Sequence, residues 1–144
     1  MVAGPDDERL ELALPGIASS VAEARSFVRG AMRSWGLPEL VDTVALLTSE
    51  LATNAVLHAR TPYVLLVERV KSGGRKVAAI RVTVFDESER IPTQREGTMD
   101  RTTGRGLALV DALARAWGTT GPGARAKGVW FELAIRAEAD VRQP

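Results

Sequence analysis

The sequence predicts an α+β fold, a two-layer α/β sandwich in which a mixed or antiparallel sheet carries helices on one face. The first observation is the order of the expected elements, which run strand, helix, helix, hairpin, helix, strands. Helices grouped in this way cover one side of a sheet, whereas helices on both sides require regular alternation with parallel strands. The second observation is the length of 144 residues, which suits one domain with a complete hydrophobic core. We therefore expect a single domain over residues 1–144, with its core at about 9–136 and a loose tail at 137–144.

The composition limits the classes of function. With 19 Lys and Arg against 18 Asp and Glu, the net charge of +1 gives no general attraction to nucleic acid or to an anionic membrane. The chain has no cysteine and one histidine, which excludes disulfides, thiolate catalysis and zinc sites rich in Cys or His. We expect no nucleic acid partner, no segment long enough to span a bilayer and a cytoplasmic protein.

The first strand and the first helix have clear local signals. Residues 9–14 alternate between apolar and polar side chains and end at a Pro-Gly pair, which is typical of a half-buried strand followed by a turn. Ser20 and Glu23 have the spacing of a capping box, and apolar residues then recur at helical intervals as far as Gly36. The pattern predicts a helix of about 15 residues with Ser20 as its N-cap.

A second, longer helix and a β-hairpin follow. The helix is expected to begin near Pro38 and to continue to Ala59, because no glycine or proline interrupts it before Pro62. Residues 63–70 and 76–85 are rich in Val, Leu and Ile and are separated by a Ser-Gly-Gly turn, which predicts two paired strands.

The pattern changes after Asp86. Residues 87–103 are polar and charged and show little apolar periodicity, so we expect a lid over a binding site. Gly104-Arg105-Gly106 ends this segment, and a helix is predicted from Leu107 to near Trp117 and Gly118. A short strand and turn at 119–123 and an apolar last strand at 128–135 complete the chain.

Three polar residues of the long helix share one side. At about 100° per residue, Glu50, Asn54 and His58 fall within an arc of about 80° beside the apolar face. Such groups cost free energy if they are buried without partners. A carboxamide oxygen beside a carboxylate suits a hydrated Mg²⁺ ion and its phosphate, with the carboxylate handling a proton. The alternative is a surface helix with ordinary polar residues.

Two further signals are weak when taken singly. Asp86 at a strand end either begins a turn or accepts a hydrogen bond from an adenine amino group. Gly104 and Gly106 either form a simple turn or let a phosphate approach the N-terminus of a helix, where free N–H groups and the positive dipole end favour anions. All three signals in this order, separated by a hairpin and a lid, are hard to attribute to chance.

These motifs together resemble those of the GHKL, or Bergerat-fold, ATPases, and within them the small anti-sigma-factor serine/threonine kinases. The segment 49–59 is similar to the N box of that family, and 84–88 and 104–110 are similar to its first and second glycine-rich boxes. The closing strand at 128–133 and the first helix are similar as well, so the resemblance covers about residues 9–136.

The resemblance implies a role for each motif residue. Asn54 would bind Mg²⁺, and Glu50 would be the general base that accepts a proton from the attacking hydroxyl. Asp86 would read the adenine of ATP, and Arg105 is a candidate for stabilising the transferred charge. His58 is not assigned to the catalytic set. The residues that would hold the nucleotide phosphates are Gly104, Arg105, Gly106 and Leu107.

The resemblance also implies a reaction and partners. It implies a homodimeric kinase that transfers the γ-phosphate of ATP to a STAS-type anti-anti-sigma protein and separately sequesters a sigma factor. A second hypothesis is a nucleotide-binding regulatory module that sequesters a partner without phosphorylating it. A third, a histidine kinase catalytic domain, is disfavoured because the chain has no dimerisation helix with a phosphoacceptor histidine.

Two departures from the family pattern predict weaker nucleotide binding. The family commonly has Asp-x-Gly-x-Gly, whereas here Asp86 is followed by Glu87-Ser88-Glu89-Arg90. The last motif commonly has a threonine that holds adenine through water, whereas here Gly128 follows Lys127.

Overall fold

The computed structural model of the protein describes residues 8–71, 77–86, 101–120 and 127–135. In these residues five strands form one sheet with the order β1-β2-β3-β5-β4, and every pairing is antiparallel. The elements are β1 (Arg9–Leu14), α1 (Ser20–Ser34), a 3₁₀ turn η1 (Pro38–Leu40), α2 (Val41–Asn54), a π-helical turn η2 (Ala55–Ala59), β2 (Tyr63–Lys71), β3 (Val77–Asp86), α3 (Arg101–Leu113), β4 (Ala116–Thr119) and β5 (Lys127–Ala134).

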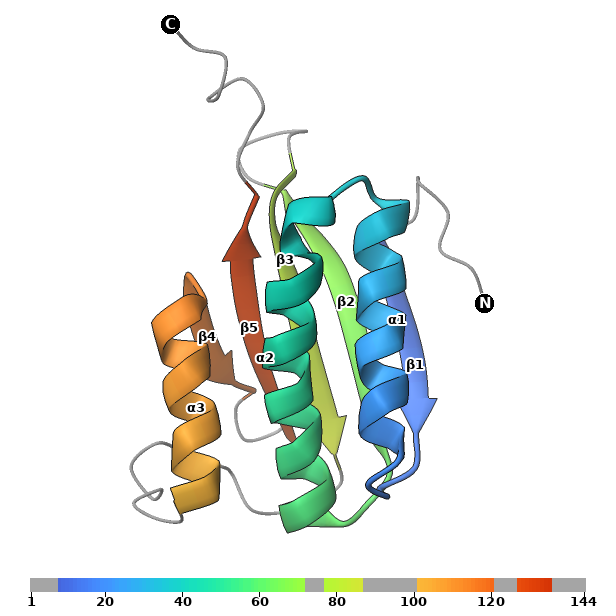
Figure 1. Ribbon diagram of the computed structural model, residues 1–144, viewed down its shortest axis with the longest axis vertical. Coiled ribbons are helices and arrows are strands. Elements are labelled where there is room, and N and C mark those ends of the chain that lie inside the picture. Colours follow the sequence, from blue (N-terminus) through green and yellow to red (C-terminus); the bar gives the residue numbers. More distant parts are fainter. Residues whose placement is uncertain (1–7, 72–76, 87–100, 121–126, 136–144) are drawn as a thin grey trace, which may run out of the picture.

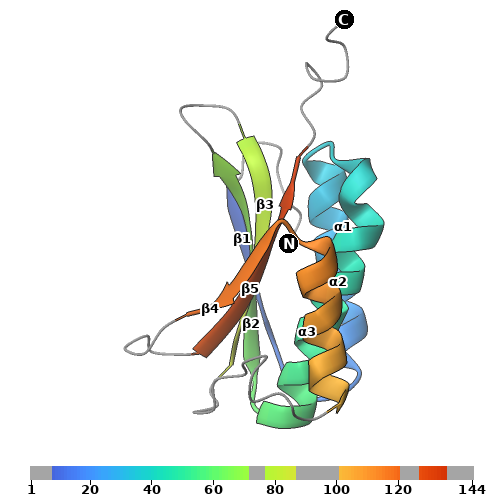
Figure 2. The same cartoon turned by 90° about the vertical axis from the view of Figure 1, so that its left-hand side faces the viewer.

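The helices form one layer on one face of the sheet. Figure 1 shows α1, α2 and α3 side by side in front of the strands, and Figure 2 shows all three on the same side of the sheet. The predicted two-layer α+β sandwich is confirmed, and the sheet is antiparallel rather than mixed.

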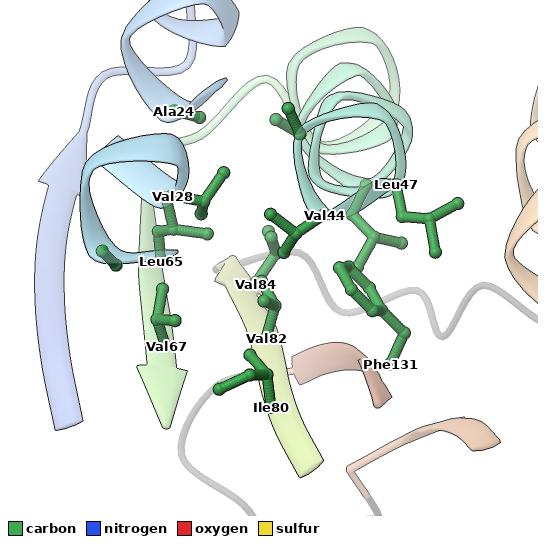
Figure 3. Packing of buried hydrophobic residues seen from close by; sticks show 14 of the residues in the cluster. Ala24, Val28, Val44, Leu47, Leu65, Val67, Ile80, Val82, Val84 and Phe131 are labelled. Atoms are coloured by element: carbon green, nitrogen blue, oxygen red, sulfur yellow. The ribbon is translucent and has the colours of Figure 1, made fainter. Parts of the chain in front are cut away.

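The hydrophobic core lies between the two layers. Side chains alternate along a strand, so Ile80, Val82 and Val84 of β3 share the face that meets the helices. Figure 3 shows Val44 of α2 pointing toward Val82 and Val84. Each fully buried aliphatic side chain of this kind contributes about 1.5–3 kcal/mol through loss of contact with water.

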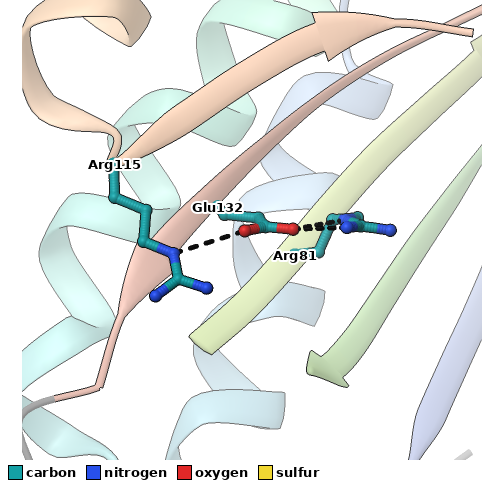
Figure 4. Close-up of polar contacts among 3 residues, drawn as sticks. All are labelled: Arg81, Arg115 and Glu132. Carbon is teal, nitrogen blue, oxygen red and sulfur yellow. Dashed lines mark hydrogen bonds and ion pairs between the residues drawn. The ribbon is translucent and has the colours of Figure 1, made fainter. Parts of the chain in front are cut away.

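The other face of the sheet carries a buried carboxylate between two arginines (Figure 4). The Glu132 side chain of β5 is only 8% exposed, and Arg81 of β3 donates from Nε to Glu132 Oε2 at 2.7 Å. Arg115, just before β4, donates from Nε to Glu132 Oε1 at 3.3 Å. One residue thus connects three neighbouring segments of the sheet, and loss of one partner would leave a buried charge less well paired.

The start of α1 differs from the prediction. Ser20 is the first residue of the helix and Ser19 is the N-cap, with no side-chain capping hydrogen bond. The Ser20 hydroxyl is buried and instead lies 2.7 Å from the Tyr63 hydroxyl of β2. The predicted capping box is therefore wrong, because a tertiary hydrogen bond to a buried phenol takes the place of the local one.

The end of α3 and the position of β4 also differ from the prediction. The helix ends at Leu113, and Trp117 and Gly118 lie in β4 opposite Phe131 and Trp130 of β5. Strand pairing with β5 therefore overrides the helical pattern that the sequence suggested. The predicted strand and turn at 119–123 lie largely outside the described residues, as does the lid at 87–103, whose last three residues belong to α3.

The long helix also departs from one expectation. From Pro38 to His58 it has 21 residues and is long and apolar enough to cross a membrane, so the expectation that no segment reaches that length is wrong. In the fold the helix lies on the sheet, and its apolar side forms part of the core. A core helix of a soluble protein meets the same criteria of length and composition.

Tyr63 is the only tyrosine of the chain and its hydroxyl sits beside the start of α1. Burial raises the pKa of Tyr63 above its ordinary value of 10.0, the hydrogen bond with Ser20 lowers it in part, and the negative charge of Glu23 raises it. The fold therefore favours the neutral phenol over the phenolate.

We expect the protein to lose stability at alkaline pH through Tyr63. A raised folded-state pKa means that this contribution is fully present below about pH 10 and is lost as the pH rises through the folded-state value. Phenolate absorbance reports this residue alone and should titrate above the value found in denaturant. The Tyr63→Phe variant should lack this alkaline decline and should be less stable at neutral pH by about 1 kcal/mol, because Ser20 loses its partner. A tyrosine that titrates equally in the folded and denatured protein would contradict the assignment.

Candidate functional site

Three elements meet at one end of the sandwich. Figure 1 shows the last turns of α2, the end of β3 and the start of α3 at the same, lower end of the molecule. The strand register agrees, because Asp86 at the end of β3 pairs with Tyr63, which opens β2 shortly after the helix ends. The fold thus brings together the three motifs that are widely separated in the sequence.

The rotation of α2 about its axis is fixed by contacts on both flanks. Ser49 faces α1, because Arg25 of α1 donates from Nη1 to Ser49 Oγ at 3.0 Å. Leu47 is fully buried and points away from α1 in Figure 3, which is the side on which α3 lies in Figure 1.

This rotation decides where Glu50 and Asn54 point. Successive helical residues differ by about 100°, so Glu50, three residues after Leu47, lies about 60° from Leu47 around the helix axis, on the flank toward α3. Asn54 is one turn further on and shares this flank. Both side chains are half-buried, and His58 in the next turn is exposed. The sequence predicted that Glu50, Asn54 and His58 align at the rim of the apolar face. Glu50 and Asn54 are half-buried as this requires, whereas His58 lies in the π-helical turn and is exposed.

The helix changes type directly after Asn54. Ala55–Ala59 form a π-helical turn, closed by a hydrogen bond of 2.9 Å from the Arg60 N–H to the Ala55 carbonyl, and Arg60 has a φ of 58°. The sequence predicted a regular helix to Ala59, and neither glycine nor proline marks the change. Single π-helical turns occur frequently at functional sites, so the one next to Asn54 is a further feature of this region.

Asp86 is the last residue of β3. Alternation places it on the same face as Val82 and Val84, which point into the core beneath the helices. Its side chain is half-buried, and β3 contacts the π-helical turn that follows α2. Asp86 thus faces the helix layer at the end where Asn54 lies.

The glycine motif lies inside α3 and not before it. The helix starts at Arg101, so the prediction that it starts at Leu107 is wrong. Helix formation is cooperative, and two glycines cost only about 1 kcal/mol each relative to alanine, so the preceding residues extend the helix. Leu107 is fully buried, so only its backbone is available to a ligand. The side chain of Arg105 lies outside the described part of the structure.

The described side chains near Asn54 offer few ligands for a metal ion. Among the described residues no group of three or more His, Asp and Glu side chains could hold a metal ion. Mg²⁺ keeps several waters and is commonly bound through one or two protein oxygens and the phosphates of its nucleotide. A half-buried Asn54 oxygen beside Glu50 fits a magnesium ion of this kind and would not support a metal caged by protein alone.

The comparison with protein families bears directly on this arrangement. Residues 14–126 match the model of the histidine kinase-like ATPase domain, a span that contains Glu50, Asn54, Asp86 and the glycine motif. The chain belongs to the histidine kinase-like ATPase family. A comparison with curated proteins gave no match.

Membership in this family agrees with the broader resemblance found in the sequence. A histidine kinase-like ATPase domain is an ATP-binding domain with ATPase or kinase-type activity. The polar flank of α2 and the end of β3 therefore form the candidate nucleotide site. The family does not distinguish between the acceptors to which phosphate is transferred.

Proposed function

We propose that this histidine kinase-like ATPase is an anti-sigma-factor-type serine/threonine kinase. It transfers the γ-phosphate of ATP to a STAS-type anti-anti-sigma protein and sequesters a sigma factor. The observation that carries this proposal is the position of Glu50 and Asn54 on the flank of α2 toward α3, at the end of the sheet where Asp86 faces the helices. The proposal extends to a homodimer, as the sequence resemblance implies, and to a cytoplasmic location.

Each side chain has one task in this proposal. Asn54 offers its amide oxygen to Mg²⁺, and Glu50 accepts the proton of the attacking serine or threonine hydroxyl. Bound magnesium supplies neutralisation of the charge on the β- and γ-phosphates. Asp86 accepts a hydrogen bond from the amino group at C6 of adenine, where guanine carries a carbonyl. Partial burial of all three groups strengthens these interactions relative to bulk water.

The phosphates would be held by the backbone at the start of α3. In the helix that begins at Arg101, only the first four N–H groups lack an internal partner, and Gly104 is the last of these. Backbone N–H contacts from Arg105, Gly106 and Leu107 therefore require the first turn to unwind. The two glycines lower the free energy lost on unwinding, because each destabilises the helix by about 1 kcal/mol relative to alanine.

The kinase reaction is tested by incubating the protein with ATP labelled on the γ-phosphate and with purified STAS-domain proteins. Transfer of label to a serine or threonine of one of them is the expected result. ATP binding with no transfer to any of them would instead favour the nucleotide-binding module that sequesters a partner. Absence of ATP binding would overturn both functions.

Replacing Asp86 by asparagine should reduce discrimination between ATP and GTP. The variant loses a charged acceptor for the adenine amino group and gains an N–H donor that suits the guanine carbonyl. A hydrogen bond to a charged group is worth about 1.5–3 kcal/mol, so the affinity ratio should fall about 10- to 100-fold. Calorimetric titration with both nucleotides measures the ratio. Asp42→Asn at the exposed start of α2 is the matched control, and an equal ratio in both variants would contradict the role of Asp86.

A further inference from the structure

Phe85 stands immediately before Asp86 and points to the other face of the sheet. Its strand partner is Gly128 of β5, and the next pair along the two strands is Asp86 with Lys127. Any group that fixes Phe85 against Gly128 therefore acts on the backbone of the neighbouring Asp86.

The Phe85 ring fills the space next to Gly128 that a side chain at this position would need. A Cβ atom at this position would lie 2.9 Å from Phe85 Cδ1 and 3.0 Å from Cε1, closer than carbon atoms normally approach. The positive-φ glycine among the described residues is Gly36, so Gly128 is required for space and not for an unusual backbone conformation. This explains why a threonine cannot stand here while Phe85 keeps its place.

Thr120, directly after β4, holds Gly128 from the other side. The Gly128 N–H donates to Thr120 Oγ1 at 2.8 Å, and the Thr120 N–H donates to the Gly128 carbonyl at 2.8 Å. The Thr120 methyl carbon is also only 3.2 Å from the place a Cβ of Gly128 would take. Both backbone polar groups of Gly128 are thus used by one residue, so Gly128 has little freedom to yield to the ring.

We propose that Phe85, seated on Gly128 and held there through Thr120, is a positioning residue that aims Asp86 at the nucleotide base. The proposal rests on the nucleotide-binding function proposed above and assigns Phe85 and Gly128 to base selectivity. A carboxylate that selects a base by a hydrogen bond depends on its direction, and small displacements of such groups reduce function strongly.

The test uses the steric contact itself. Gly128→Ala should push the ring away and lower the ratio of ATP to GTP affinity on the order of 10-fold. Phe85→Leu alone should lower it by a smaller factor, because the space above Gly128 is left partly empty. The double variant refills that space with the alanine methyl group, so its ratio should return toward that of the parent protein. If Gly128→Ala fails to fold, comparison of Phe85→Leu with the double variant still decides the matter.

Gly118→Ala provides a matched control. A Cβ at Gly118 would lie 3.0 Å from Trp130 Cζ2, so this glycine of β4 also lies beneath an aromatic ring of β5. Its pair Trp130 stands opposite Thr83 of β3, three residues before Asp86. Its replacement should lower the melting temperature and leave the ATP to GTP ratio unchanged. The proposal is overturned if Gly128→Ala behaves like this control, or if the double variant shows no recovery. A parent protein that binds ATP in these titrations shows that such a failure concerns Phe85 and Gly128 and not the proposed function.

Discussion

Replacing Asn54 by alanine is expected to abolish the magnesium-dependent part of ATP binding. Asn54 ends the α-helical part of α2, is half-buried and lies on the flank toward α3. Its amide oxygen is of the ligand type that Mg²⁺ prefers, and alanine has no oxygen to replace it. Affinity for ATP in the presence of magnesium should fall about 10- to 100-fold, and affinity without magnesium should change little.

Calorimetric titration with and without magnesium measures this difference, and Thr53→Ala is the control on the adjacent helical position. A second readout is available because Asn54 is the only asparagine of the chain. Protein labelled at asparagine gives one pair of side-chain NH2 signals, and Mn²⁺ added with ATP in place of Mg²⁺ should broaden both. Unperturbed signals under saturating nucleotide would place the metal elsewhere.

The strands and the long helix were predictable because their signals are local. Alternation in residues 9–14 gave β1 with its observed bounds, and the uninterrupted apolar pattern after Pro38 gave the helix that carries Glu50. The hairpin of β2 and β3 followed from residue type and turn chemistry. Their one-sided covering by helices followed from the order of the elements.

The departures arise where tertiary contacts override local preference. The sequence pattern predicts that a helix ends at Trp117. In the structure Trp117 instead pairs with Phe131 in the sheet and donates from Nε1 to Asp111 Oδ1 at 2.9 Å. The sequence pattern predicts Ser20 as an N-cap, yet its hydroxyl forms a hydrogen bond with that of Tyr63, 43 residues later in the chain. No pattern of residues near either position reports the distant partner.

The candidate site could be predicted in part for the same reason. Glu50 and Asn54 align through helical periodicity, which the sequence shows directly. Their meeting with Asp86 at one end of the sandwich followed from the resemblance, since spacing in the chain does not encode it. The π-helical turn after Asn54 and the contact of Phe85 with Gly128 had no local signal, because both depend on how neighbouring elements pack.

Replacing Glu50 by glutamine should separate chemistry from binding within the same helix. If Glu50 is the general base, the variant keeps the shape of the side chain but cannot accept the proton of the attacking hydroxyl. Phosphoryl transfer should then fall on the order of 10²-fold or more, while ATP affinity stays close to that of the parent. Asn54→Ala should instead lower the affinity for ATP in the presence of magnesium, because it removes a ligand of the metal that accompanies the nucleotide.

Single-turnover transfer of labelled phosphate and calorimetric titration on the same preparations measure the two effects. Glu39→Gln is the matched control, since it makes the same chemical change in the exposed 3₁₀ turn at the opposite end of this helix. If Glu50 were only a polar residue on a surface helix, both variants would transfer phosphate at the parental rate and differ from it in stability by no more than about 0.5 kcal/mol. We expect the Glu50→Gln protein to bind ATP normally and to transfer phosphate slowly at every concentration of nucleotide and acceptor. Saturation removes any deficit in ground-state binding, so this result would show that the Glu50 carboxylate acts in the transition state.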